Sequence, residues 1–299
     1  MDDSGLTTLR LWSAALAVWL GAVIGSFANV VIARVPRGES VVRPRSRCPR
    51  CGAPIAWYDN IPVLSYVLLG ARCRACRARI AVRYPLVEAL VAAAAWVAWR
   101  RHGLGAAFGA ELAFAASLVA LAFIDLDTWL LPHALTWPLI VLGVAASALG
   151  LTPATLASSL AGAAVGFGAF AAVSWLGSVV FKKEALGFGD VWLLAGLGAW
   201  LGVKALLPTV LLASLQGSLV GIVQVLLGRG TPGPAAPAEP PRSSPGATPA
   251  STPPATSDDD WVPPRHAVPF GPFLALGALE WLYLSDAIAG LVPLLRPFR

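Results

Sequence analysis

Long apolar stretches recur along most of this chain and limit its fold more than any other feature. A helix that crosses a lipid bilayer needs roughly 20 mostly apolar residues. Only 13% of the residues are charged and the mean hydropathy is +0.70, which is far from the composition of soluble domains. We therefore expect an all-α polytopic membrane protein with about eight transmembrane helices. The apolar stretches place these helices near residues 11–33, 84–101, 104–124, 134–151, 155–180, 190–203, 205–228 and 268–293.

Positive charge is concentrated between the first two predicted helices. From residue 34 to residue 83 the chain has eleven arginines but only two acidic residues, Glu39 and Asp59. Loops rich in Lys and Arg stay on the cytoplasmic side of a membrane, so we place this segment in the cytoplasm. Nucleic-acid binding is disfavoured, because the segment lacks the interleaved aromatics of a base-stacking surface and is tied to the membrane at both ends. If each later predicted helix crosses the membrane in turn, the acidic motifs around residues 125 and 190 also lie on the cytoplasmic side.

Four cysteines, the only ones in the chain, form two Cys-x-x-Cys pairs: Cys48 with Cys51, and Cys73 with Cys76. Their spacing is typical of zinc ribbons, in which each pair lies in a tight turn and all four thiolates reach one metal ion. Two disulfides would need an oxidising compartment, whereas the arginines indicate the reducing cytoplasm. Unliganded thiols are the third possibility. We expect a structural Zn²⁺ bound by all four cysteines in a small, zinc-ribbon-like cytoplasmic loop domain.

Two acidic motifs interrupt otherwise apolar sequence. The segment FIDLDTWLLPH contains Asp125 and Asp127, and LGFGDVWLL contains Asp190. A carboxylate is costly to bury near lipid, so such residues often mark a functional site, although aspartate is also a favoured helix N-cap. Each residue taken alone leaves both interpretations open. Both motifs are predicted at the cytoplasmic edge of the membrane, and this favours a functional site. Two carboxyl groups that lie close together share a proton and can activate water to attack a peptide bond.

The sequence divides into five predicted segments. Residues 1–35 form a retained first transmembrane helix, 36–83 the basic cysteine domain, 84–228 the membrane core, and 268–299 the last transmembrane helix with its tail. Between the core and the last helix lie residues 229–267, of which eleven are proline. Segments of this composition bury too little apolar surface to fold, so we expect a disordered linker.

Several of these motifs together resemble those of the type IV prepilin peptidases, the leader peptidases of pilus and type II secretion systems. The resemblance implies a membrane aspartyl protease of the Gly-x-Gly-Asp type, with Asp125 and Asp190 as catalytic residues and Asp127 in a supporting role. The implied location is the bacterial inner membrane, with the active site facing the cytoplasm. The resemblance covers nearly the whole chain outside the proline-rich segment. The motifs that carry it are GSFANVVIARVPRGES, CPRCGAPIAWYDNIPVLSYVLLGARCRAC, RYPLVEAL, IDLDTWLLP, LGFGD, LGAWLG and VPFGPFLALG.

The same resemblance implies substrates and a second activity. Members of this family remove a short basic leader from type IV prepilin or pseudopilin precursors, and the bifunctional members then methylate the new amino terminus with S-adenosylmethionine. The resemblance does not identify the residues that bind this methyl donor. A cysteine domain makes the chain similar to the bifunctional members, and its arginines suit anionic lipid headgroups. The alternatives are a peptidase that has lost methylation and a non-enzyme, a transporter or assembly scaffold.

Four residues near the motifs carry further expectations. Family members commonly have a lysine where this chain has Trp192, and an acidic or amide residue where it has His133. A histidine at such a helix start is more often a hydrogen-bonded surface group than a base. Glu88 either contacts the methyl donor or pairs with an arginine such as Arg83, and pairing is the simpler expectation. Glu184 is expected to pair with a neighbouring lysine or to steer the substrate.

Overall fold

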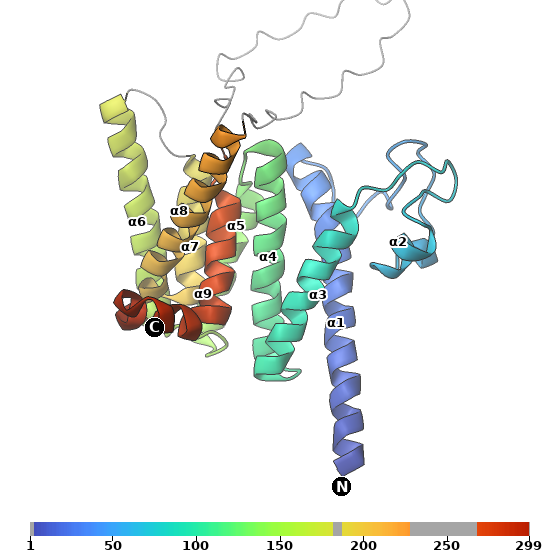
Figure 1. The fold of residues 1–299 in the computed structure, drawn as a ribbon, viewed down its shortest axis with the longest axis horizontal. Helices are drawn as coiled ribbons and strands as arrows, with labels where there is room; N and C mark the ends of the chain where they lie inside the picture. Colours follow the sequence, from blue (N-terminus) through green and yellow to red (C-terminus); the bar gives the residue numbers. More distant parts are fainter. Residues whose placement is uncertain (1–2, 182–186, 228–267, 299) are drawn as a thin grey trace, which may run out of the picture.

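The fold is helical in the part of the chain that the computed structural model describes, residues 3–181, 187–227 and 268–298 (Figure 1). These residues contain nine α-helices: α1 (Asp3–Arg34), α2 (Leu64–Leu68), α3 (Arg83–His102), α4 (Ala106–Thr128), α5 (His133–Ala148), α6 (Leu156–Phe181), α7 (Phe188–Leu201), α8 (Val203–Leu226) and α9 (Gly271–Leu291). They also contain three 3-10 helices: η1 (Val35–Arg37), η2 (Trp57–Asn60) and η3 (Pro293–Phe298). The same residues form no β-strand, only two isolated β-bridges within the cysteine segment.

The long helices lie where the apolar stretches predicted them. All of the α-helices in the described residues except the short helix α2 correspond to a predicted span, and α1 begins at Asp3, earlier than expected. Five of them, α1, α4, α6, α8 and α9, are long and apolar enough to cross a membrane. The helices α5 and α7 are apolar but shorter, and α3 carries Glu88 and ends in two arginines and a histidine. The helix positions are therefore confirmed, whereas five rather than eight helices meet the length and composition criterion for crossing.

The helix α4 lies between two groups of helices and contributes to both of their cores. One face of α4 packs Phe108 and Ile124 against α1 and α3. Another face packs Phe114 and Leu121 against side chains of α5 to α9. Figure 1 shows the same order, with α1 and α3 on one side of α4 and the other long helices on its opposite side. The two groups of helices are thus joined through a single shared helix.

Glycines hold α7 against α6, in the glycine-rich sequence LAGLGAWLG of α7. A Cβ atom added at Gly198 would lie 2.1 Å from the carbonyl oxygen of Gly162, and one added at Gly162 would lie 2.4 Å from that of Gly198. Glycine at both positions lets the two backbones approach this closely, which is a common way for helices to pack in membranes. Because α7 starts at Phe188, this packing fixes Asp190 in its first turn.

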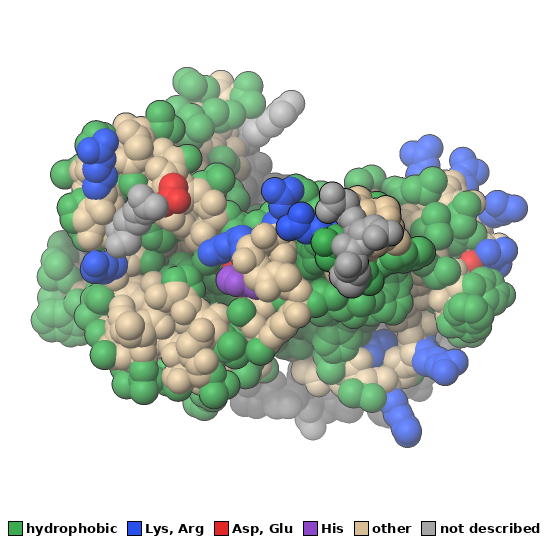
Figure 2. Space-filling view, turned by 90° about the horizontal axis from the view of Figure 1, so that it is seen from below, with side chains coloured by type: hydrophobic (Ala, Val, Ile, Leu, Met, Phe, Trp, Pro, Cys, Tyr) green, Lys and Arg blue, Asp and Glu red, His purple; other side chains and the backbone are tan. Residues whose placement is uncertain are grey.

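The two ends of the bundle differ in character. At one end the cysteine segment, residues 35–82, connects α1 to α3 and projects beside them (Figure 1). An ion pair between Arg83 at the start of α3 and Asp127 near the end of α4 places the first acidic motif at this same end. The opposite end is shown in Figure 2, where hydrophobic side chains cover large areas between separate basic groups. There, Arg101 and His102 both contact the buried carboxylate of Glu111 and fasten the turn between α3 and α4.

Two expectations concern residues outside the described ranges. They are the disordered linker at residues 229–267 and the pairing of Glu184. Both stay predictions.

Candidate active site and metal centre

The two aspartates expected to act together lie close to each other at one end of the bundle. Asp125 lies near the end of α4 and Asp190 in the first turn of α7, and they are only 5% and 9% exposed. Their carboxyl groups are close enough for their charges to interact. Leu131, in the connection after α4, packs against Gly189, which precedes Asp190, and against Gly271 of α9, which contacts Asp125. Cβ atoms added at these two glycines would lie 2.7 and 3.4 Å from the Leu131 side chain. The structure thus brings together two carboxylates from distant parts of the sequence.

A backbone group that the sequence analysis missed contacts Asp125. The N–H of Gly271, the first residue of α9, donates a hydrogen bond to Oδ2 of Asp125 at 3.0 Å. A Cβ atom at this position would lie 2.6 Å from the same oxygen, so a larger residue would displace the carboxylate. The motif VPFGPFLALG contains this glycine, but a backbone donor leaves no sequence signal that identifies its acceptor.

Asp127 is separated from the aspartate pair. The helix α4 continues past both residues, and side chains two positions apart on a helix point in different directions, so Asp127 is exposed while Asp125 is buried. The Asp127 carboxylate accepts a hydrogen bond from Arg83 and thereby joins α4 to α3. The expected ion pair between Arg83 and Glu88 is therefore wrong, because the arginine is turned toward α4.

Aromatic rings pack around the start of α7, next to Asp190. The ring of Trp192 lies 4.9 Å from that of Phe167, 5.6 Å from that of Trp137 and 5.9 Å from that of His133, measured between centroids. His133 is exposed, and its ring packs against tryptophans. Trp192 fills this cluster with a large planar ring, which a lysine side chain would not do.

The four cysteines converge, as their spacing predicted. Their sulfur atoms all lie within 4.8 Å of one another, and all four are free thiols. Each pair lies in its own tight turn: the N–H of Cys48 donates to the carbonyl oxygen five residues later at 2.9 Å, and that of Cys73 does the same at 2.8 Å. Gly52 and Arg77 occupy the same place in the two turns, with left-handed φ values of +70° and +57°. A glycine thus allows the tight backbone conformation in the first turn, while an arginine adopts the same conformation in the second.

The geometry of this cluster suits a tetrahedral metal ion. A tetrahedron with metal–sulfur bonds of about 2.3 Å has edges of roughly 3.8 Å, and the sulfur atoms of Cys48 and Cys76 lie 3.8 Å apart. Hydrogen bonds from the backbone N–H groups of Cys51 and Arg50 lower the pKa of the Cys48 thiol from 9.0 to about 6. A lowered pKa favours the thiolate, which is the form that binds a metal, whereas the neighbouring thiols of Cys76 and Cys48 raise the pKa of Cys51 to about 11. A bound cation would favour the thiolate at all four positions. The donor set therefore fits Zn²⁺ held by four thiolates.

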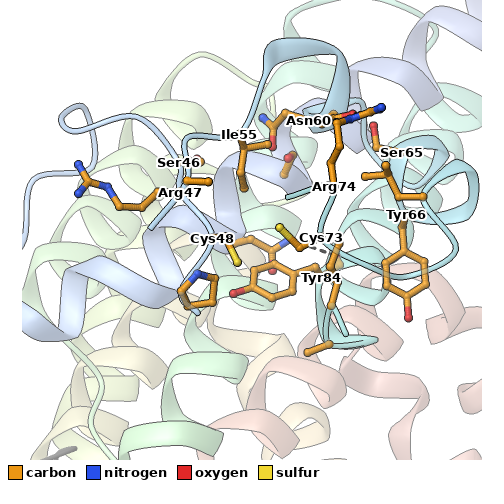
Figure 3. Close-up of a pocket in the computed structure, with 18 of the residues that line it drawn as sticks. Ser46, Arg47, Cys48, Ile55, Asn60, Ser65, Tyr66, Cys73, Arg74 and Tyr84 are labelled. Carbon is orange, nitrogen blue, oxygen red and sulfur yellow. Dashed lines mark hydrogen bonds and ion pairs between the residues drawn. The ribbon is translucent and has the colours of Figure 1, made fainter. Parts of the chain in front are cut away.

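A large open cavity lies between the cysteine cluster and the adjoining ends of α1 and α3. Its volume is about 1530 Å³, and the buried side chains of Asn29 and Glu88 form part of its wall. Figure 3 shows Cys48 and Cys73 close to Tyr84 in this wall. The cavity is large enough for a small organic molecule.

Arginines are the most numerous charged residues of the cavity wall, with one buried acid among them. Of the three acidic lining residues, Asp59 accepts two hydrogen bonds from Arg74, at 2.7 and 2.6 Å, which lower the pKa of Asp59. Glu88 is buried and accepts a hydrogen bond from the N–H of Val63 at 2.7 Å. The wall thus offers positive charge around a single buried carboxylate. The arginines that line it are Arg34, Arg37, Arg47, Arg50, Arg72, Arg74, Arg77 and Arg79.

Comparison with known proteins gives matches over most of the chain. Residues 19–102 match the family model of the Bacterial Peptidase A24 N-terminal domain, and residues 112–222 match that of the Type IV leader peptidase family. The first model thus covers the second half of α1, the cysteine segment and α3, and the second covers most of α4 to α8. No solved structure is significantly similar to the chain.

Relatives with established names are similar over most of their length. The chain is 43% identical to the Prepilin leader peptidase/N-methyltransferase of Myxococcus xanthus, over 92% of this chain and 91% of that protein. It is 39% identical to the protein of the same name from Pseudomonas aeruginosa, over 74% and 84%. It is 36% identical to the Type 4 prepilin-like proteins leader peptide-processing enzyme of Escherichia coli, over 90% and 93%.

Proposed function

Because the chain belongs to the Type IV leader peptidase family, we propose that it cleaves the leader from type IV prepilin or pseudopilin precursors and then methylates the new amino terminus. The observation that carries the proteolytic part is the joint burial of Asp125 and Asp190. The names of relatives that match the chain almost end to end support the methylation.

The aspartate pair supplies the acid and the base for peptide hydrolysis. Two neighbouring carboxyl groups do not both ionise at low cost, so the pair holds one proton between them. The charged group takes a proton from water, and the water oxygen attacks the carbonyl carbon of the scissile peptide bond. The protonated group hydrogen-bonds the carbonyl oxygen on which negative charge develops. This chemistry requires no serine, cysteine or metal nucleophile.

In our proposal Cys48, Cys51, Cys73 and Cys76 bind a structural Zn²⁺. Support comes from the clustering of the four sulfur atoms, the edge length that matches a tetrahedral site and the lowered pKa of Cys48. Four protein ligands leave no open coordination position, so the ion organises the segment and takes no part in catalysis.

The cavity beside the cysteine cluster is the site at which we place S-adenosylmethionine. This donor supplies a methyl group on a positively charged sulfonium and also carries an ammonium and a carboxylate. Glu88 is buried in the wall and suits the cationic end, while the surrounding arginines suit the carboxylate. In this arrangement Glu88 contacts the donor. This is the other of the two expectations for Glu88, and it stays open because Arg83 pairs with Asp127 instead.

For the membrane arrangement we propose eight crossing helices in the bacterial inner membrane, with the aspartate pair and the cysteine domain on the cytoplasmic side. The eleven arginines in residues 36–83 and at the adjoining end of α1 support this orientation. Residues 1–35 and 268–299 provide the first and last spans, and 84–228 the core. The same arginines are placed to contact anionic lipid headgroups.

The proteolytic role is tested by co-expressing the protein with a prepilin and following the loss of the leader as a size shift. Asp125→Asn and Asp190→Asn are each expected to reduce cleavage at least 1000-fold, in line with the loss of an acid–base partner. Asp127→Asn is the matched control, because it changes the same helix without touching the pair, and it should keep most of the activity.

Methylation is followed in the same variants by supplying cleaved pilin and a labelled methyl donor. Both aspartate variants should still transfer label, since the cavity is separate from the pair. Unchanged cleavage in both variants would favour the transporter or scaffold, and absence of label transfer by the wild type would favour a peptidase without methylation.

A further inference from the structure

The two aspartates have unequal surroundings. Asp125 accepts a hydrogen bond from the backbone N–H of Gly271, at the first turn of the 21-residue helix α9. For Asp190, no residue among 3–181, 187–227 and 268–298 provides a comparable donor to the carboxylate. Both groups are buried, and among the described residues the difference in their hydrogen bonds is this one donor.

A backbone N–H that donates to a carboxyl oxygen stabilises its ionised form. The dipoles of α9 and α7 do not distinguish the two aspartates, because the start of α9 faces Asp125 while Asp190 lies in the first turn of α7. Pro272 follows Gly271 and has no N–H of its own, so Gly271 presents the first free donor of α9 at this point. The negative charge of the pair is therefore held on Asp125, and the shared proton on Asp190.

Other charged groups near Asp125 do not reverse this assignment. On its own helix, Asp127 is neutralised by Arg83 of α3. From α7 the facing group is Asp190 itself. From α9, the backbone N–H of Gly271 contacts Asp125.

On the basis of the proposed function, we infer that Asp125 is the ionised base, that Asp190 is the protonated acid, and that Gly271 is the positioning residue that fixes this division. In the first step Asp125 takes a proton from water, the water oxygen bonds to the carbonyl carbon, and Asp190 gives its proton to the carbonyl oxygen. In the second step the carbon–nitrogen bond breaks, the proton on Asp125 passes to the leaving amine, and the hydroxyl proton returns to Asp190. Atoms and charge balance, and the pair is restored to its starting state.

The first test is the pH dependence of kcat/KM for leader cleavage by Gly271→Ala. Its methyl group displaces the Asp125 carboxylate from the donor, so the base becomes protonated at higher pH. The acidic limb of the profile should move upward by about one pH unit, while methylation of cleaved pilin stays at the wild-type rate.

Two glycines of the same helix provide controls. At Gly290 an added Cβ meets nothing within 4 Å, and at Gly277 it would lie 2.8 Å from the carbonyl oxygen of Thr209 on α8. Gly290→Ala should leave the profile unchanged, and Gly277→Ala should lower it equally at all pH values. An acidic limb that stays in place in Gly271→Ala, or an alkaline limb that moves instead, would overturn the assignment.

A second measurement decides the matter even if Gly271→Ala does not fold. Infrared difference spectra at neutral pH, wild type minus variant, report whether a protonated carboxyl band is lost. The band should be lost in Asp190→Asn and kept in Asp125→Asn, and the reverse result would overturn the assignment. Failure of the proposed function is a separate outcome, since it would appear as a wild-type protein that does not cleave prepilin.

Discussion

Glu88 has two roles that can be separated at the level of a single residue. Its carboxylate accepts the N–H of Val63, which has a positive φ of 58°, an unusual conformation for a β-branched residue. It also places the one buried carboxyl group in the wall of the cavity, where our proposal gives it a negative charge opposite the cationic end of the donor. The first role needs only an acceptor oxygen, whereas the second needs the charge.

We expect Glu88→Gln to raise the KM for S-adenosylmethionine about tenfold, which corresponds to about 1.4 kcal/mol. The amide oxygen still accepts the Val63 N–H, so the fold and prepilin cleavage should stay at wild-type levels. Glu88→Ala also removes the acceptor and should lower stability by about 1–3 kcal/mol. Methylation kinetics and thermal unfolding in detergent check both outcomes, and an unchanged KM in Glu88→Gln would place the donor elsewhere.

At the level of helices, the position of Asp190 depends on the contact between α6 and α7. Gly162→Ala forces a methyl group against the α7 backbone, which costs roughly 1–3 kcal/mol and moves the two helices apart. Cleavage should fall at least tenfold, because the aspartate pair is then separated. Gly168→Ala is the control on the same helix, since an added Cβ there meets nothing within 4 Å. Equal cleavage rates and unfolding temperatures in the two variants would contradict this dependence.

The helix positions could be predicted because each apolar stretch is long enough to be recognised alone. The meeting of Asp125 and Asp190 could be predicted in outline, since alternating sides of the membrane bring the two motifs to one face. The Gly271 contact could not, because tertiary packing joins residues 146 positions apart through a backbone group. The partner of Arg83 was predicted wrongly for a related reason: Glu88 and Asp127 are both acidic, and only the packing of α3 on α4 decides between them.

At the level of the whole molecule, the cysteine segment is expected to depend on the proposed Zn²⁺ more than the helices do. Between residues 38 and 82 only Cys48 and Ser65 are buried, so little apolar packing holds this segment together. We expect removal of Zn²⁺ by a chelator to unfold it while the helices remain.

Trypsin provides the measurement, because the segment is rich in arginine. After chelation it should cut between residues 38 and 82, whereas protein with bound Zn²⁺ is protected there. Cys48→Ser should behave like the chelated wild type without any chelator. Equal digestion with and without the metal would show that the segment folds independently of it.

The place of α4 between two cores bears on how such a chain can shorten in evolution. Lipid tails are as apolar as the side chains of α1 and α3 that now cover one face of α4. A lineage that lost everything before α4 would give up the ion pairs of Asp127 and Glu111 but keep the core formed by α4 to α9. The membrane itself would replace the missing neighbours, and the descendant would remain a protease without a methyl-transfer activity.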